Sequence, residues 1–432
     1  MRTFIIIWLG QAVSIIGSSM TAFAFTLWVW ELTGHATSIA LFGFFRQVPQ
    51  FLIIPIAGVI VDRWNRKYLM MLSDTVSALL TITILLLYLT HSLQLWHLYL
   101  AVAIQGIFEQ IHELAYLSSV SMIVPKQQYS RASSIGFLAS SSSVIIAPAL
   151  AGVLYVVIGL VGILIIDIMT CVIAVSALLL VRIPQPTTAQ AGAQSHANLK
   201  QELYFGWHYI TARPGLLAML ALVALFWFTL SFGNSLSSPL ILARSGNDAK
   251  VLGIVSSAAG LGGIIGALLV STWGGFKRRI HGVLLGMVGI GLSRTVFGLG
   301  IIPLIWIPSQ FCSSINFPLL GSANDSIWLK KVRPDVQGRV LSTRSLVERG
   351  ASIVAYLIAG PLADYVFEPA MMSFGSLVPT LGWILGTGRG VGMALLYVIS
   401  SLGMLLIGLS GYAFRTLRDV EIIVPDYDTS AE

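Results

Sequence analysis

The chain has 432 residues, of which 56% are hydrophobic and only 10% are charged, and its formal net charge is +7 at pH 7. Soluble globular proteins carry about 25% charged residues, so this composition excludes the soluble class. A membrane-spanning helix needs about 20 apolar residues, and a chain of this length has room for roughly twelve of them. The apolar stretches run for about twice the length of a barrel strand, which excludes an outer-membrane barrel.

Hydropathy and the positions of turn residues predict twelve membrane-spanning helices, and the fold class is therefore an all-α membrane protein. The first six helices are expected near residues 4–30, 38–61, 68–90, 96–124, 132–157 and 160–182. The other six are expected near residues 215–241, 251–273, 280–300, 303–329, 340–363 and 391–414.

A polar segment divides the predicted fold into two halves. Residues 183–214 contain Pro184, Pro186 and Pro214, a Thr/Ala/Gln/Gly tract and several charged residues. We therefore predict an N-terminal six-helix half over residues 1–182, a cytoplasmic linker over 183–214, a C-terminal six-helix half over 215–414 and a cytoplasmic tail over 415–432. Short matches between the halves, such as Gly152 with Gly360, favour an internal repeat, as expected of a transporter.

The basic residues predict the orientation of the helices. When the N-terminus is placed inside, most Lys and Arg fall in cytoplasmic connections, and only Arg244, Lys250 and Arg389 fall outside. This asymmetry follows the positive-inside rule and places both termini in the cytoplasm. The basic charge then faces anionic lipid, so we expect membrane lipids as partners and no nucleic acid.

Motifs for other kinds of chemistry are missing from the sequence. Cys171 and Cys312 lie in apolar stretches without the spacing of metal ligands, and no P-loop for ATP is present. His112 and Glu113 begin an H-E-x-x-H pattern, but Tyr116 stands where the second His of a zinc protease would be. We therefore expect neither an enzyme nor a cofactor or metal.

The loop after the second predicted helix carries a recognisable motif, Gly58-x-x-x-Asp62-Arg63-x-x-Arg66-Lys67. It resembles the signature loop of the major facilitator superfamily. A glycine allows two helices to approach closely, and the basic residues can meet lipid phosphates. The resemblance implies that this loop is a gate between the halves and that Asp62 pairs near the start of the eleventh helix, around Ser342 or Arg344. Asp74, which follows the loop, is expected to make a cytoplasmic gate contact.

Other stretches are similar to the macrolide-efflux type of this superfamily, among them residues 206–210, 338–340 and 360–364. The resemblance implies a drug:proton antiporter that exports lipophilic, macrolide-like compounds by alternating access. We expect it to act as a monomer in a bacterial inner membrane. One alternative is an exporter dedicated to an endogenous amphiphile such as a siderophore or a lipid-like metabolite, and another is a non-transporting sensor or scaffold.

Charged residues inside the predicted helices are candidate proton sites, because a charge at bilayer depth is costly. Glu109 and Glu113 are four residues apart on the fourth helix, with His112 beside them. Two neighbouring carboxylates disfavour double ionisation, which suits proton exchange. A hydrogen-bonded pair that only fixes helix packing is the alternative. Asp325, near the inner end of the tenth helix, is either a further cavity carboxylate for proton coupling or simply a group at the helix end.

Two arginines inside predicted helices need partners. Arg46 lies in the second helix and Arg294 in the ninth. Glu348 and Asp167 are the candidate partners, and we expect these pairs to serve structure.

The resemblance places the first, fourth, seventh and tenth helices around a central cavity. Six residues on these helices are candidates for lining a substrate cavity: Gln11, Phe25, His112, Trp227, Asn234 and Asn316. Aromatic rings with a few hydrogen-bonding groups suit a large amphiphile. Residues 4–30, 215–241 and 303–329 contain no Lys or Arg, which disfavours phosphate esters as substrates.

Overall fold

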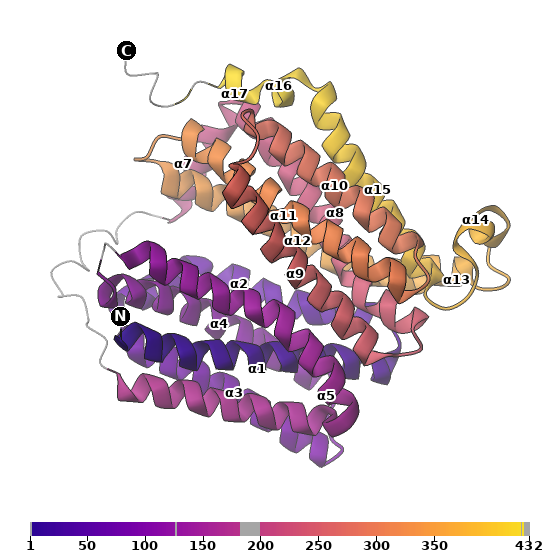
Figure 1. Cartoon of the computed structure of the whole chain (residues 1–432), viewed down its shortest axis with the longest axis horizontal. Helices are drawn as coiled ribbons and strands as arrows, with labels where there is room; N and C mark the ends of the chain where they lie inside the picture. The colour runs from indigo at the N-terminus through magenta and orange to yellow at the C-terminus, as the bar shows by residue number, and fades with distance from the viewer. Residues whose placement is uncertain (1, 126–127, 182–198, 425, 427–432) are drawn as a thin grey trace. The chain divides into compact units, whose positions relative to one another are not determined.

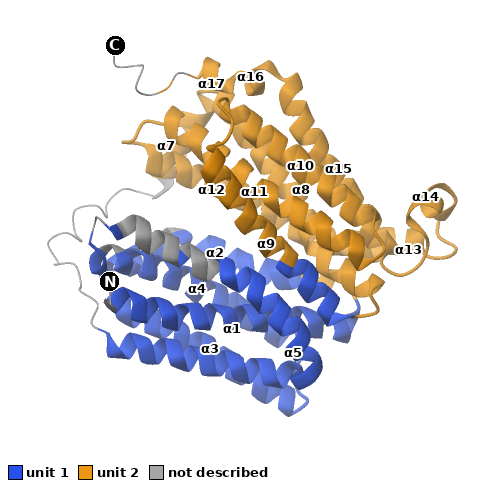
Figure 2. Cartoon of the chain, in the orientation of Figure 1, with its two compact units in different colours: residues 1–34, 41–196, 248–257 blue, residues 35–40, 197–247, 258–432 orange. Residues whose placement is uncertain are grey.

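The computed structural model describes residues 2–125, 128–181, 199–424 and 426, and this part of the chain is helical without strands (Figure 1). The chain forms two compact units, which have different colours in Figure 2. Unit 1 comprises residues 1–34, 41–196 and 248–257, and unit 2 comprises residues 35–40, 197–247 and 258–432.

Unit 1 is a bundle of long helices in which α1 and α3 both pack on α5. Its elements are α1 (Arg2–Thr33), α2 (Ala36–Arg63, whose first turn belongs to unit 2), α3 (Arg66–Leu89), α4 (Leu95–Ile123) and α5 (Tyr129–Leu180). Gly17 allows the contact between α1 and α5, because a Cβ there would lie 2.2 Å from the Thr170 hydroxyl oxygen. The first residues of α9 complete the unit.

A sharp bend divides α5 into two arms. Gly159 interrupts the helix with φ 64° and ψ −169°, a conformation that glycine adopts without steric cost. The arms on either side correspond to the fifth and sixth helices predicted from the sequence.

Unit 2 contains the remaining long helices and several short ones. The long helices are α8 (Pro214–Arg244), α9 (Ala249–Trp273), α10 (Arg279–Leu299), α11 (Pro303–Lys331), α12 (Gln337–Leu362) and α15 (Val391–Ala413). The short ones are α7 (Leu199–Thr211), η2 (Ala363–Phe367), α13 (Glu368–Met371), α14 (Val378–Leu385), α16 (Arg415–Arg418) and α17 (Val420–Ile423). α10 packs on α11 and α15, and α8 packs on α12 and α15.

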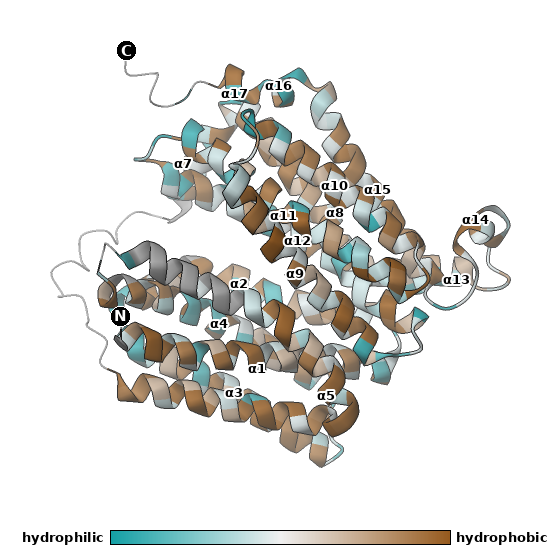
Figure 3. Cartoon of the chain, in the orientation of Figure 1, coloured by the Kyte–Doolittle hydropathy of each residue, from teal (hydrophilic) through white to brown (hydrophobic). Residues whose placement is uncertain are grey.

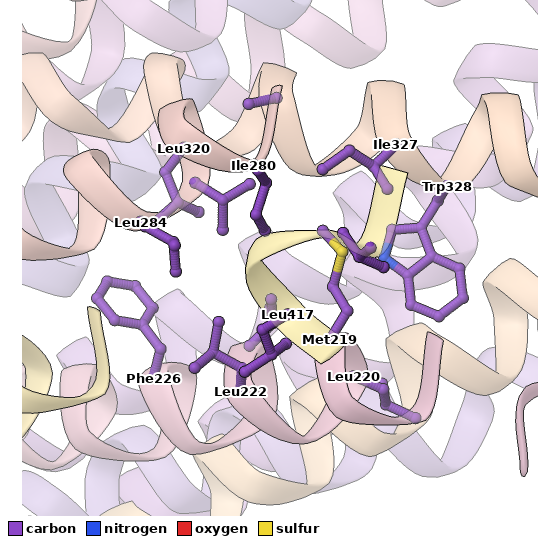
Figure 4. Close-up of a cluster of buried hydrophobic side chains, with 14 of the residues drawn as sticks. Met219, Leu220, Leu222, Phe226, Ile280, Leu284, Leu320, Ile327, Trp328 and Leu417 are labelled. Carbon is purple, nitrogen blue, oxygen red and sulfur yellow. The ribbon is translucent and has the colours of Figure 1, made fainter. Parts of the chain in front are cut away.

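The core of unit 2 is a cluster of buried apolar side chains from these helices. Phe226, Leu284, Leu320 and Trp328 are each at most 2% exposed, and Figure 4 shows them together with Leu417. Leu417 belongs to α16, so the start of the predicted tail at residues 415–432 packs into unit 2. Residues 425 and 427–432 of that tail lie outside the described residues.

The predicted linker also contains structure. Its residues 199–211 form α7, which packs on α12 through Gly206, where a Cβ would lie 2.2 Å from the Thr343 hydroxyl oxygen. Residues 183–198 of the linker lie outside the described residues.

The outward faces of the long helices suit a bilayer. Leu180, Leu304 and Val157 are 84%, 78% and 73% exposed, and Figure 3 shows mostly hydrophobic residues along the long helices. Nine of the described helices are long and apolar enough to span a membrane. With the two arms of α5 taken separately, and with the more polar α4 and α11, they form the twelve-helix arrangement, which confirms the predicted fold class.

Candidate functional site

Unit 1 contains a cavity of about 140 Å³ that is lined mainly by polar side chains of α1, α3 and α4 and by two residues of α2. Five residues selected from the sequence line it: Gln11, Phe25, Asp74, Glu109 and His112. The structure therefore brings together two of the predicted carboxylates and three of the predicted substrate residues.

Asp74 connects three helices at this cavity. The Gln11 amide donates a hydrogen bond of 3.0 Å to Oδ2 of Asp74, and Nε2 of His112 lies 3.3 Å from Oδ1. The side chain of Asp74 is 11% exposed and that of His112 is 19% exposed. Nε2 of His112 makes no hydrogen bond to the described residues, so this contact has the distance of an ion pair without the alignment of a hydrogen bond.

Glu109 forms an ion pair with Arg46 across α4 and α2. Nη2 of Arg46 lies 2.9 Å from Oε1, its Nε donates to Oε2 at 3.3 Å, and the Gln50 amide donates to Oε2 at 3.0 Å. The pair is 40% and 43% exposed. Gly106 lets the helices approach here, because a Cβ at this position would lie 2.5 Å from the Arg46 carbonyl oxygen.

The partner suggested for Arg46 was therefore wrong: its carboxylate is Glu109 and not Glu348 or Asp167. Glu113 is exposed and makes no hydrogen bond or ion pair with the described residues. The two glutamates thus have different surroundings. Because Arg46 neutralises Glu109, repulsion between two ionised carboxylates no longer gives a reason for the glutamates to share a proton. A role of Glu109 or Glu113 in proton coupling stays a prediction.

Two basic residues of the signature loop, Arg66 and Lys67, donate hydrogen bonds to backbone carbonyls of neighbouring helices. Nη1 of Arg66 donates to the Ser118 carbonyl at 3.0 Å, near the end of α4. Nζ of Lys67 donates to the carbonyls of Leu179 and Val181 at 3.2 and 2.7 Å, at the end of α5. Cations at helix C-termini satisfy carbonyls that lack partners within the helix. These side chains are thus engaged within the protein and not only with lipid phosphates.

Two of the remaining residues of the loop, Asp62 and Arg63, are exposed. A Cβ on Gly58 would meet no atom of unit 1 within 4 Å, so close approach of helices within unit 1 does not explain this glycine. The Asn65 carboxamide oxygen accepts from the backbone N–H of Lys67 at 3.0 Å and caps α3. Pairing of Asp62 with the C-terminal half stays a prediction.

Asp325 lies in unit 2, in a network of charges rather than in the cavity of unit 1. Nη2 of Arg344 is 2.9 Å from Asp325, and Nε of Arg344 is 2.8 Å from Glu348. Asp325 is 63% exposed, whereas Arg344 and Glu348 are 11% and 14% exposed. The partner of Glu348 is therefore Arg344.

The three substrate residues predicted on α8 and α11 also belong to unit 2. Trp227 packs partly against the apolar core, edge-on to Phe226 at 6.3 Å. Asn234 is exposed. The amide of Asn316 donates to the Cys312 carbonyl of its own helix at 2.8 Å. None of the three lines the cavity of unit 1.

Sequence reasoning missed Asp167 as part of a buried hydroxyl cluster. Asp167 is 2% exposed and accepts hydrogen bonds of 3.0 Å from the hydroxyls of Ser18 on α1 and Thr81 on α3. It is not the partner of an arginine. The two partners of Asp167 are 149 and 86 residues away in the sequence, so no local pattern connects them to it. The spacing of hydroxyl residues along α1 was the one signal that could have suggested such a cluster.

Twelve predominantly apolar helices make this a multi-pass membrane protein, and the polar cavity of unit 1 with its titratable groups fits a transporter. The chain belongs to the Major Facilitator Superfamily, whose sequence model matches residues 7–356.

Known relatives fall in the same class. The chain is 27% identical over 370 residues to macrolide efflux protein A of Streptococcus pyogenes, covering 84% of this chain and 90% of that protein. It is 22% identical to the multidrug efflux pump Tap of Mycolicibacterium fortuitum, covering 81% and 86% of the two chains. The nucleoside transporter NupG shares the fold with a TM-score of 0.71 at 12% identity, covering 95% of this chain and 99% of that chain.

Proposed function

We propose that this chain is a secondary active exporter of macrolide-like amphiphiles that is driven by proton entry. The names of its relatives, macrolide efflux protein A and multidrug efflux pump Tap, support the substrate class. The observation that carries the proposal is the contact of Asp74 with His112 beside the cavity of unit 1, because it places two titratable groups where a ligand can bind.

The lining of the cavity suits part of an amphiphile. Phe25 and Phe42 meet edge-on at 6.3 Å and offer an apolar surface, while Ser14 and Ser18 offer hydroxyls. Polar side chains outnumber these rings in the lining, so the cavity suits the hydrogen-bonding part of an amphiphile better than its apolar face. A cavity of about 140 Å³ accommodates one part of a macrolide rather than the whole molecule.

Asp74 is the first candidate for the proton site in this proposal. When Asp74 is ionised, it attracts a protonated His112 and accepts the hydrogen bond from Gln11, which holds α1, α3 and α4 together. Protonation of Asp74 removes its negative charge and weakens both contacts. The occupancy of one proton is thereby linked to the packing of three helices around the cavity, which lets a proton change the conformation of unit 1 in this proposal.

The other predicted carboxylates rank below Asp74. Glu109 faces the cavity but is balanced by Arg46, and Asp325 is exposed and balanced by Arg344. Glu113 does not line the cavity. We also propose that the protein acts as a monomer in the bacterial plasma membrane, with both termini in the cytoplasm and with Asp62 as a gate residue.

Reconstitution into liposomes tests the proposal. An imposed pH gradient should drive accumulation of a radiolabelled macrolide, and addition of the macrolide should dissipate the gradient, as followed with an internal pH dye. A protonophore should abolish both effects. Accumulation of the macrolide that is insensitive to the protonophore would reject proton coupling, and absence of uptake would favour an endogenous amphiphile as the substrate.

A further inference from the structure

Asp167 of α5 is a buried carboxylate without a cationic partner among the described residues. It is 2% exposed, and its two carboxylate oxygens accept from the hydroxyls of Ser18 and Thr81. The sequence suggested Arg294 as an arginine that needs Asp167 or Glu348. Arg294 instead lies in unit 2, where it is 3% exposed and donates from Nε to the Ser313 hydroxyl at 3.3 Å, so that prediction was wrong.

Hydroxyls of two helices surround this carboxylate. Ser18 of α1 donates to Oδ1, Thr81 of α3 donates to Oδ2, and Thr21 of α1 also lies beside Asp167. Thr21 is 4% exposed, and its hydroxyl has no hydrogen-bond partner among the described residues. A hydroxyl can donate to an ionised carboxylate and can also accept from a protonated one. The cluster can therefore satisfy both protonation states of Asp167, and Thr21 offers the acceptor that the protonated state needs.

The hydroxyl cluster adjoins the cavity of unit 1. Ser18 and Thr21 are both among the residues that line this cavity, whose volume of about 140 Å³ has room for water. The Ser18 hydroxyl can pass its proton to Oδ1 of Asp167 while its oxygen takes a proton from a water molecule in the cavity. A proton can thus reach the buried carboxylate although the carboxylate itself does not line the cavity.

Other titratable groups on α1, α3 and α5 do not neutralise Asp167. Cys171, one turn further along α5, interacts electrostatically with Asp167 and with Asp74 of α3, and all three side chains are acids. Glu31 of α1 accepts from the Tyr155 hydroxyl on the other arm of α5. The basic residues in the first turn of α3 donate to backbone carbonyls. The described residues therefore leave a proton as the cation that neutralises Asp167.

An ionised carboxylate at bilayer depth is costly, and hydroxyls offset only part of that cost. We propose that Asp167 is a second proton site of unit 1, which takes up and releases its proton through Ser18 during transport. This second site rests on the proposed proton-driven export and extends it. Asp74 and Asp167 each carry one proton, so two protons enter for each exported molecule.

Infrared difference spectroscopy on the purified full-length protein tests the site without any substrate. The carbonyl stretch of a protonated carboxyl group should be present in the wild type at acidic pH and should disappear at alkaline pH. Asp167→Asn should lose one such band, and Asp74→Asn should retain that same band.

Two threonine variants provide a matched pair. Thr81→Val removes a hydroxyl that donates to Oδ2 of Asp167, so it should shift the frequency of the Asp167 band. Thr170→Val is the control, because Thr170 donates to the backbone carbonyl of Asp167 at 2.8 Å and not to its carboxylate. This variant should leave the band where the wild type has it.

The second measurement is the number of protons that enter per macrolide moved in liposomes, from a pH dye and a radiolabel. This ratio should fall about twofold in Asp167→Asn and should stay unchanged in Thr170→Val. A purely structural role of Asp167 would leave the ratio unchanged in Asp167→Asn as well, because asparagine keeps the shape of the side chain.

Three results would overturn the proposal. The wild type lacks a carboxyl band that Asp167→Asn removes, or that band persists at alkaline pH, or the ratio is equal in the wild type and in Asp167→Asn. A wild type that moves no macrolide would contradict the proposed export, while the infrared bands would still decide whether Asp167 exchanges a proton. If Asp167→Asn fails to fold, the comparison of Thr81→Val with Thr170→Val assigns the band.

Discussion

At the scale of single residues, the contacts of Asp74 distinguish it from every other carboxylate of unit 1. Asp74 accepts from a neutral amide and faces a histidine, whereas Glu109 faces an arginine that is always charged. Asp74 thus lies beside a second side chain that can carry or release a proton, whereas Glu109 lies beside one that keeps its proton.

The first prediction therefore concerns Asp74. Asp74→Asn keeps the shape of the side chain but cannot be ionised, so proton-driven macrolide uptake in liposomes should fall at least tenfold. Glu31→Gln, at an exposed carboxylate of α1 that accepts from the Tyr155 hydroxyl, is the control and should stay within about twofold of the wild type. An Asp74→Asn variant that still couples macrolide uptake to proton movement would show that the mechanism does not need Asp74.

The second prediction separates structure from coupling at Glu109. Its ion pair with Arg46 is about 40% exposed on each side, and such exposed pairs contribute up to about 1 kcal/mol. Glu109→Gln should therefore lower the melting temperature only slightly. If the pair serves packing, the double variant that combines Arg46→Glu with Glu109→Arg should transport as the wild type does, because it keeps an ion pair. A double variant that folds but does not transport would assign Glu109 a role in proton or substrate binding.

The sequence allowed prediction of which residues line the cavity of unit 1 better than of which residues pair. Gln11, Asp74, Glu109 and His112 are polar residues on apolar helices, so each could be selected by its cost in a bilayer. The partner of Glu109 is 63 residues away, and pairing depends on the rotation of α2 and α4 about their axes, which hydropathy does not determine.

At the scale of elements, the membrane-spanning helices could be predicted because long apolar runs and their basic flanks are local signals. α7 and the α16–α17 segment were missed as folded elements because each is short. Leu417 and Val420 are buried in unit 2 only because α8 and α10 supply apolar neighbours from elsewhere in the chain. The bend between the arms of α5 was placed correctly, since Gly159 interrupts two apolar runs.

The third prediction tests that bend. Gly159 has φ 64° and ψ −169°, a region that essentially only glycine adopts and where a residue with a Cβ costs about 1–3 kcal/mol, so Gly159→Ala should lower the melting temperature by a few degrees. Gly321 is helical and a Cβ there would meet nothing within 4 Å, so Gly321→Ala should leave the melting temperature equal or higher. Equal melting temperatures for the two variants would show that the bend is not under conformational constraint.

At the scale of the whole molecule, the two units have different chemistry. Unit 1 has a polar cavity with carboxylates and a histidine, and unit 2 has a buried arginine without a carboxylate. The internal repeat inferred from the sequence thus applies to the helices and not to the charges within them. The substrate class also belongs to this scale, because neither the fold nor any single residue identifies it.

The fourth prediction concerns that class. Energised bacteria that express the chain should retain less macrolide than empty-vector cells, and a protonophore should remove the difference, because export is proposed to depend on proton entry. A charged phosphate ester should be retained equally in both strains, since Arg46, the one Lys or Arg among the described lining residues, is already neutralised by Glu109. Asp74→Asn, expressed at the same level in the membrane, controls for indirect effects of expression. Equal macrolide retention in cells with and without the wild-type chain would contradict drug export, and the search would then turn to endogenous amphiphiles that expressing cells release into the medium.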